Sequence, residues 1–248
     1  MNKTADNLEW ASLDGSFKLA QRSDKFKLGT DSVLLSYISN IKPKYRLVDL
    51  CSGTGAVGYL AFLRYNTAKT IFVDCDEDMT ELSKLTASEN GVDDRFLHIT
   101  KDVYNINNSI IKNQWADYVT VNPPYFGNNS GKLNKTSDMN NARHCDDDFL
   151  NILFQKSYNI LKDGGKISVV HRSENLNDIC FNMRLNKIEP KRMRLVYSYF
   201  GKNASLVLIE GMKNSSSGII CESPLVLYES PNVYTEEFKK IGEIQTGR

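Results

Sequence analysis

A glycine-rich segment directly after an apolar strand constrains the fold of this chain more than any other feature. Residues 46–51 (RLVDLC) are mostly apolar and predict a buried strand, and a helix is expected over residues 56–65. Between them, Gly53, Gly55 and Gly58 have the G-x-G-x-x-G spacing of dinucleotide-binding turns. Glycines in such a turn let the backbone approach a ligand closely, and the following helix offers free N–H groups. The segment therefore predicts a bound cofactor that contains adenosine.

The rest of the chain alternates strand and helix patterns, which is typical of a mostly parallel sheet with helices on both faces. Further strands are expected over residues 70–75, 96–100, 117–121 and 166–171, and helices over 78–89, 146–161 and 175–186. Residues 122–144 predict a long loop, and Asp146, Asp147 and Asp148 suit the cap of the helix after it. Strands over 192–200 and 204–210 are expected to form a hairpin that closes the sheet edge, followed by a strand over 224–228 and a helix from about Thr235. The fold class is α/β, with a seven-stranded sheet and a C-terminal β-hairpin.

Length and composition indicate one ordinary globular domain. We expect residues 31–248 to form it and residues 1–30 to be an N-terminal extension that can hold short strands. The chain has no apolar run near the roughly 20 residues of a membrane helix, and its polar start resembles no secretory signal. Its five cysteines are scattered and have no metal-ligand spacing. A cytoplasmic protein that binds neither membrane nor metal is expected.

Three acidic residues are placed to contact the cofactor. Asp74 lies about twenty residues beyond the glycine turn, where an acid binds ribose hydroxyls. Asp49 lies inside the first strand, where it suits a ligand with a positively charged amino acid end and would repel a pyrophosphate. Asp102 follows the third strand and could accept a hydrogen bond from an adenine amino group, although the position also suits a helix N-cap.

Asn122-Pro123-Pro124-Tyr125 follows the fourth strand, at the edge where open α/β sheets bind ligands. The Asn122 side-chain carbonyl and the Pro123 backbone carbonyl can accept hydrogen bonds from an exocyclic NH2 group. They would orient the amine and stabilise the positive charge that develops as it attacks a methyl group. The prolines hold this geometry, and Tyr125 offers a ring on which an extruded base can stack. A rigid polar turn is the alternative interpretation.

Basic residues gather in the C-terminal third, although the formal net charge is only +1. Between Phe181 and Asn203 the only acid is Glu189. Such a patch can hold phosphates, and a solvated helix face and strand edge is the alternative. We expect residues 184–248 to form a basic RNA-docking hairpin and tail. The expected phosphate contacts are Arg184, Lys187, Lys191, Arg192, Arg194 and Lys202, with Arg143, His144 and Arg172 nearer the pocket.

Together these motifs resemble the class I methyltransferases that use S-adenosylmethionine (SAM) to methylate amino groups. Within this group, the chain more closely resembles the bacterial tRNA (adenine-N6)-methyltransferases that modify the adenosine next to the anticodon of valine tRNA. Outside the glycine and Asn-Pro-Pro-Tyr motifs, the resemblance rests on Lys27–Ser32 (KLGTDS), Phe126, Ala142–His144, Lys162–Ile167, His171-Arg172, Pro224-Leu225 and Tyr234-Thr235, and it extends from about Phe17 to Ile241.

The resemblance implies a Rossmann-like class I methyltransferase fold, SAM as cofactor and a tRNA, the valine isoacceptor, as partner of a monomeric enzyme. It implies that Asn122, Pro123, Pro124 and Tyr125 hold the target adenine. The implied cofactor pocket consists of Lys27, Thr30, Asp31, Asp49, Cys51, Gly53, Gly55, Asp74, Asp102, Val103 and Asn122. Cys51 departs from the family, in which glycine is frequent there, and is expected to narrow the methionine end of the pocket.

The same chemistry leaves other substrates open. Glutamine N5-methyltransferases that act on release factors share the Asn-Pro-Pro-Tyr logic, but they usually carry an N-terminal helical domain for which the segment before Leu47 is too short. DNA adenine or ribosomal guanine methylation needs the same pocket. A non-catalytic protein that binds cofactor and RNA is a further alternative, and the intact motif argues against it. An NAD oxidoreductase would lack a placed proton donor.

Overall fold

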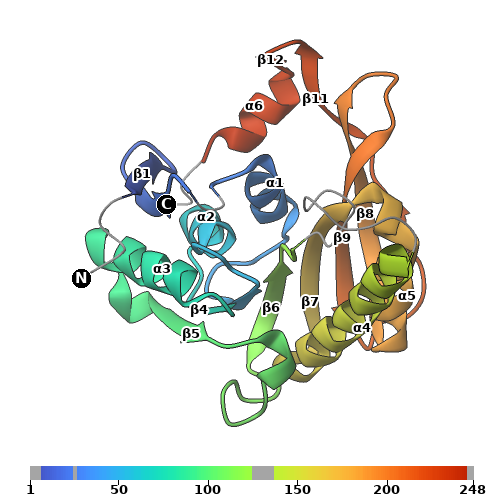
Figure 1. Ribbon diagram of the computed structural model, residues 1–248, viewed down its shortest axis with the longest axis horizontal. Coiled ribbons are helices and arrows are strands. Elements are labelled where there is room, and N and C mark those ends of the chain that lie inside the picture. Colours follow the sequence, from blue (N-terminus) through green and yellow to red (C-terminus); the bar gives the residue numbers. More distant parts are fainter. Residues whose placement is uncertain (1–6, 25–26, 125–136, 245–248) are drawn as a thin grey trace.

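The computed structural model describes residues 7–24, 27–124 and 137–244, with the backbone alone over 137–147. Its main feature is a ten-stranded sheet in the order β12-β11-β8-β9-β7-β6-β3-β4-β5, with β10 also paired to β8. Helices lie on both sides of this sheet (Figure 1). The α/β fold class is therefore confirmed.

Five strands form the parallel half of the sheet: β3 (Arg46–Leu50), β4 (Lys69–Asp74), β5 (Phe96–Thr100), β6 (Ala116–Val121) and β7 (Leu161–Arg172). The parallel half begins in the middle of the sheet with β3. The chain then adds β4 and β5 on one side and crosses to β6 and β7 on the other. The strand order therefore reverses between β3 and β6. In open α/β sheets this reversal opens a crevice at the carboxyl ends of the strands, which is the usual place for a ligand.

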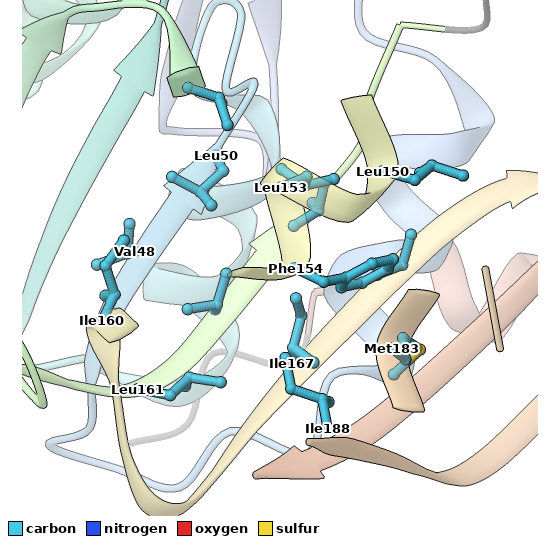
Figure 2. Close-up of a cluster of buried hydrophobic side chains, with 14 of the residues drawn as sticks. Val48, Leu50, Leu150, Leu153, Phe154, Ile160, Leu161, Ile167, Met183 and Ile188 are labelled. Carbon is cyan, nitrogen blue, oxygen red and sulfur yellow. The ribbon is translucent and has the colours of Figure 1, made fainter. Parts of the chain in front are cut away.

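The helices pack on the two faces because the central strands are apolar on both sides. The first face carries α1 (Thr30–Ile38), α2 (Ala56–Tyr65) and α3 (Glu77–Glu89), and the second carries α4 (Ser137–Ile160) and α5 (Leu176–Leu185). On β3, Leu47 packs with Ala61 of α2, while its neighbour Val48 belongs to the core under α4 and α5. Figure 2 shows Val48 and Phe154 in this second core, which is the largest single hydrophobic cluster among the described residues.

The C-terminal half adds antiparallel strands. The strands β8 (Ile188–Tyr199) and β9 (Ala204–Lys213) form the expected hairpin, and β9 pairs with β7. The hairpin does not close the sheet, because β11 (Leu225–Ser230) runs parallel to β8 and pairs with β12 (Val233–Tyr234). With β10 (Ile220–Cys221), these strands make ten where seven were expected. Strands of two residues are too short to produce an alternating pattern. The last helix, α6 (Glu236–Gly242), begins where it was expected, and Thr235 caps it.

The two largest errors in the predicted boundaries concern α4 and β7. Helix α4 begins at Ser137, so it takes up the end of the expected loop, and Asp146 to Asp148 lie inside the helix instead of capping it. Aspartate disfavours a helix interior only weakly, and extending a formed helix is easier than nucleating one. Strand β7 begins at Leu161 and contains Gly164 and Gly165, which were expected to lie before it.

The segment expected to be an N-terminal extension contains a hairpin of β1 (Leu8–Ser12) and β2 (Lys18–Arg22) that packs on α3. The Ala20 N–H donates to Thr86 Oγ1 at 2.9 Å. Asn90 accepts from the Lys18 N–H at 2.9 Å and donates to the Lys18 carbonyl at 2.7 Å. These bonds fix the hairpin to α3 and its C-terminal cap. Along the described part of the chain, we find no helix whose length and apolar character would allow it to cross a membrane.

Candidate active site

A cavity of about 500 Å³ lies at the carboxyl ends of β3, β4, β5 and β6, where the strand order reverses. Its volume is within the range of small-molecule sites, roughly 300–1,000 Å³. The wall brings together nine residues that the sequence marks out: Lys27, Cys51, Gly53, Asp74, Asp102, Val103, Asn122, Pro123 and Pro124. Segments that are far apart along the chain therefore meet in one site.

The glycine turn forms the floor between β3 and α2. Three of its residues have positive φ angles: Cys51 (55°), Gly53 (52°) and Gly55 (83°). A Cβ on Gly55 would lie 2.6 Å from Ser83 Oγ and 2.8 Å from a ring carbon of Tyr59, so this position has no room for a side chain. Gly55 is needed for the packing of the turn on α3 and does not line the cavity, whereas Gly53 does.

Asp74, at the end of β4, contacts the glycine turn directly and lines the cavity. Its Oδ2 accepts from the Gly53 N–H at 2.7 Å, and its Oδ1 accepts from the Asp76 N–H at 2.9 Å. These bonds fix the carboxylate, and each oxygen keeps a lone pair for a ligand hydroxyl. The N-cap interpretation of Asp102 is confirmed, because its Oδ1 caps the short helix η2 (Val103–Asn105) by accepting from the Tyr104 N–H at 2.9 Å. Asp102 also lines the cavity, and a hydrogen bond to an adenine amine stays a prediction.

Besides Gly55, three further predicted cofactor residues lie away from the cavity wall. Thr30 and Asp31 are in the first turn of α1, where Ser32 lines the cavity instead. Asp49 is 1% exposed and lies beneath the turn. It accepts from Thr120 Oγ1 at 2.7 Å and from the Gly58 N–H at 3.1 Å. Asp49 thus joins β3, β6 and α2, and it positions the glycine turn from below.

Burial raises the pKa of Asp49 to about 7, although the hydrogen bonds from Thr120 and Gly58 oppose the shift. An unfolded aspartate has a pKa of about 3.9. Between these two pH values the folded state keeps a proton that the unfolded state releases. Protonated Asp49 therefore stabilises the fold fully below about pH 4, and this contribution is lost as the pH rises to about 7, on the order of 4 kcal/mol.

We expect Asp49→Asn to remove this loss, because asparagine stays neutral. The measurement is the difference in free energy of unfolding between the two proteins, from urea titrations between about pH 4 and about pH 8. Burial also lowers the pKa values of His98 and His171 to about 4, so these histidines make the stability of both proteins depend on pH. Their contribution is the same in the two proteins and cancels in the difference, which leaves the contribution of Asp49. Parallel stability curves would contradict a raised Asp49 pKa.

Asn122, Pro123 and Pro124 follow β6 and form one wall of the cavity. Asn122 is half-buried, Pro123 is buried and Pro124 is exposed. The β6 strand is held between β3 and β7, so the start of this motif is fixed by the sheet. The position suits a substrate nitrogen that enters from outside the strand ends. Tyr125, the last residue of the motif, lies outside the described residues.

The sequence did not identify several residues of the cavity wall. Phe149 of α4 and Tyr104 of η2 both line it, and their ring centroids are 6.2 Å apart. Met79 and Lys101 also contribute. Phe149 is part of an ordinary apolar helix pattern, and nothing in that pattern distinguishes a cavity residue from a core residue. Among the described residues, no group of His, Cys, Asp or Glu side chains could hold a metal ion.

The basic residues expected to bind RNA do not form one patch. Lys187 and Lys202 lie beyond opposite ends of the long strand β8. Arg192 pairs with Glu222 at 2.6 Å and Arg194 with Glu237, while Arg184 lies 3.3 Å from Glu189. Lys191 donates to the Ser216 carbonyl at 3.0 Å, and Arg172 lies 3.8 Å from Glu174. The side chains of Arg143 and His144 are outside the described part of the chain. Fewer of these basic side chains are therefore available to bind RNA phosphates than the sequence indicates, because several are paired with carboxylates.

Comparison with known families gives the site a chemical context. The model of a family described as the methyltransferase small domain matches residues 22–189. The chain belongs to this methyltransferase family. The match covers the glycine turn, the acidic residues and the Asn-Pro-Pro segment, and the protein has the class I methyltransferase fold with C-terminal antiparallel strands.

Curated relatives share low identity over most of this methyltransferase. A protein of a Flavobacteriaceae bacterium (strain 3519-10), named tRNA1(Val) (adenine(37)-N6)-methyltransferase, is 23% identical over 90% of this chain and 93% of its own length. A protein of the same name from Haemophilus influenzae (strain 86-028NP) is 26% identical over 90% of this chain and 92% of its own.

Solved structures support the fold. A predicted O-methyltransferase from Agrobacterium tumefaciens superposes with a TM-score of 0.69 at 18% identity, covering 86% of this chain and 95% of that one. TYW2 of Pyrococcus horikoshii, in complex with MeSAdo, gives a TM-score of 0.58 at 16% identity, covering 85% of this chain and 73% of that one.

Proposed function

We propose that this methyltransferase transfers the methyl group of SAM to the exocyclic N6 of an adenosine in tRNA. The observation that carries the proposal is the meeting of Asn122 and Pro123 with the Gly53 turn and Asp74 in a single cavity. A nitrogen held by the Asn-Pro-Pro wall would thus lie next to a molecule held by the glycine turn. The names of the curated relatives support tRNA as the substrate.

The chemistry of the cavity wall fits SAM. Asp74 and Asp102 offer carboxylate oxygens for ribose hydroxyls and an adenine amine, and the Gly53 turn admits close backbone contact. Val57, Val73, Met79, Val103 and Phe149 supply apolar surface for a purine ring. When bound, SAM supplies an electrophilic methyl group on a positively charged sulfur.

The residues of the chain would act on the amine. The Asn122 side-chain oxygen and the Pro123 carbonyl oxygen accept the two N–H groups, which turns the nitrogen lone pair toward the methyl carbon. As the N–C bond forms and the S–C bond breaks, positive charge develops on the nitrogen, and these fixed oxygens stabilise it. The extra proton then passes to water. We further propose that Tyr125 stacks on the flipped base.

The proposal is tested by methyl transfer from labelled SAM to unmodified total tRNA, with nucleoside mass spectrometry of the product. We expect N6-methyladenosine in one tRNA species, and the valine isoacceptor and a monomeric enzyme stay predictions. Parallel reactions with a release factor, ribosomal RNA and DNA test the alternatives, because transfer to one of these and none to tRNA would overturn the substrate assignment. SAM binding without transfer to any of them would indicate a non-catalytic protein.

The salt dependence of tRNA binding tests which of the basic residues contact phosphates. Lys202 is exposed and has no ion-pair partner among the described residues, whereas Arg192 is held by Glu222 and Glu210. The quantity measured is K, the association constant of the protein for tRNA, as a function of salt concentration. We expect Lys202→Ala to reduce the slope of log K against log salt by about 0.7, the value for one single-stranded phosphate contact. Arg192→Ala is the matched control. We expect it to lower the melting temperature of the protein and to change the slope less than Lys202→Ala does. Equal slopes for wild type and Lys202→Ala would exclude a Lys202 phosphate contact.

A further inference from the structure

Three tyrosine rings stack on one another across β8, β11 and β12, the strands at the end of the sheet order opposite β5. Tyr199 of β8 lies opposite Tyr228 of β11, and Tyr228 lies opposite Tyr234 of β12. The ring centroids are 5.4 Å and 4.9 Å apart, with interplanar angles of 29° and 28°. We call these three residues the tyrosine ladder.

The ladder is only partly covered by the protein. Tyr199 and Tyr228 are half-buried, and Tyr234 is 41% exposed. A hydrogen bond between the Tyr228 and Tyr234 side chains raises the pKa of Tyr228, so the two hydroxyl groups lie close together. Large apolar surfaces that stay at the surface of a folded protein often mark a binding site.

The turn after β8 adds another aromatic ring at the Tyr199 end. The Lys202 N–H donates to the Tyr199 carbonyl at 3.3 Å, and Gly201 has a φ of 76°, so residues 199–202 form a tight turn. This turn places Phe200 at its tip, where the residue is 94% exposed. Packing within the described protein does not explain a phenylalanine at such a position.

The ladder lies on the same edge of the sheet as the active site. Strand β8 is parallel to β7 because both pair antiparallel with β9, so Tyr199 and Asn122 follow strands that end at one edge. Three strand spacings, about 14 Å in all, separate β6 from β8. The register aligns Val121 with Val169, Ile209 and Met193, so Tyr199 also lies five residues, roughly 16 Å, further along its strand than Asn122. Nucleotides that flank a base held at Asn122 can span these distances.

The two ends of the ladder differ in charge. Glu229 follows Tyr228, and Glu236 and Glu237 begin α6 just after Tyr234. Lys202 lies at the Tyr199 end, which is also the end nearer the active site. Glu236 pairs with Lys239 and Glu237 with Arg194, so Glu229 is the carboxylate at the Tyr234 end without an ion-pair partner among the described residues. A polyanion is therefore favoured more at Tyr199 than at Tyr234.

We propose that Tyr199 and Phe200 form a stacking platform for unpaired bases of the RNA that flank the target adenosine. This inference rests on the proposed function, since it assumes an RNA substrate. Any nucleobase can stack on a tyrosine or phenylalanine ring. The platform therefore contributes affinity and positions the RNA loop without selecting its base sequence. The Tyr228 ring packs against Tyr199, and the Tyr234 ring packs against Tyr228 on its other side.

The test compares variants in binding to a fluorescein-labelled RNA hairpin with an unpaired loop, measured by anisotropy across a range of salt concentrations. We expect Tyr199→Ala to weaken binding about 5- to 150-fold, the range that corresponds to one stacked base. The slope of log K against log salt should stay unchanged, because no phosphate contact is lost. Phe200→Ala, at an exposed position that poses no risk to folding, should weaken binding in the same way.

Two controls make the result specific. Tyr199→Phe keeps the ring and should bind almost as the wild type does, and Tyr234→Ala, at the acidic end, should change affinity less than about twofold. Full-strength binding by Tyr199→Ala and Phe200→Ala would overturn the inference, as would equal losses in Tyr234→Ala. A change of oligomeric state in Tyr199→Ala with normal RNA binding would assign the ladder to a contact between copies of the chain.

The wild type separates failure of this inference from failure of the proposed function. If the wild type neither methylates RNA nor binds the hairpin more tightly than a duplex of equal length, the proposed function fails and the inference fails with it. If the wild type methylates tRNA and the Tyr199→Ala and Phe200→Ala proteins bind as well as it does, only the stacking platform is overturned.

Discussion

Replacing Asn122 by alanine is expected to lower the rate of methyl transfer about 100- to 1,000-fold, the usual cost of removing one fixed group that stabilises developing charge. The variant lacks the side-chain oxygen that would accept an N–H from the target amine. Its affinity for SAM should change little, because the glycine turn, Asp74 and Asp102 remain. Single-turnover kinetics and calorimetric titration with SAM measure the two quantities separately.

The Asn122→Asp variant refines this test. Aspartate keeps an acceptor oxygen at the same position, so its rate should lie above that of the alanine variant if hydrogen-bond acceptance is what matters. The melting temperature of each variant reports on the fold. An alanine variant that turns over at nearly the wild-type rate would remove Asn122 from the mechanism.

The second large effect is expected from Gly58→Ala in α2. An alanine Cβ at this position would lie 2.2 Å from ring carbon Cε1 of Phe72. The Phe72 ring cannot retreat, since it is 1% exposed and packs against Tyr59 and Phe96 with centroids 4.8 Å and 5.5 Å away. Overpacking of this kind costs about 1–3 kcal/mol. We therefore expect a lower free energy of unfolding in urea.

The sign of this prediction makes it informative. Glycine to alanine inside a helix normally stabilises a protein by about 1 kcal/mol, so propensity alone predicts the opposite result. Gly242→Ala, at the end of α6 with nothing within 4 Å of the added carbon, is the matched control and should be neutral or slightly stabilising. A Phe72→Leu background should reduce the cost of Gly58→Ala, and a cost that is independent of residue 72 would exclude the steric explanation.

The parallel half of the fold could be predicted from the sequence because its signals are local. The apolar strands, the glycine turn and the Asn-Pro-Pro segment each occupy a few consecutive residues, and parallel strands bring their carboxyl ends together. For this reason Gly53, Asp74, Asp102 and Asn122 were expected near one another, and the structure places them in one cavity.

Features that depend on distant partners could not be predicted. Arg192 and Arg194 are part of a basic stretch in the sequence, but Glu222 and Glu237 reach them from residues 30 and 43 positions further on. Asp49 has the residue type of a ligand contact, and only the positions of Thr120 and Gly58 show that it lies beneath the turn. The start of α4 at Ser137 is set by extension of a helix through residues of weak propensity.

The strands beyond β8 also affect how the protein behaves at high concentration. Strand β8 has 12 residues, and without β10 and β11 its backbone N–H and C=O groups would form a long open edge. Such edges pair with other chains and lead to aggregation. The sheet instead ends at β12, a strand of two residues followed by the acidic start of α6. The short C-terminal strands thus protect a long hairpin from self-association, a benefit separate from any role in binding RNA.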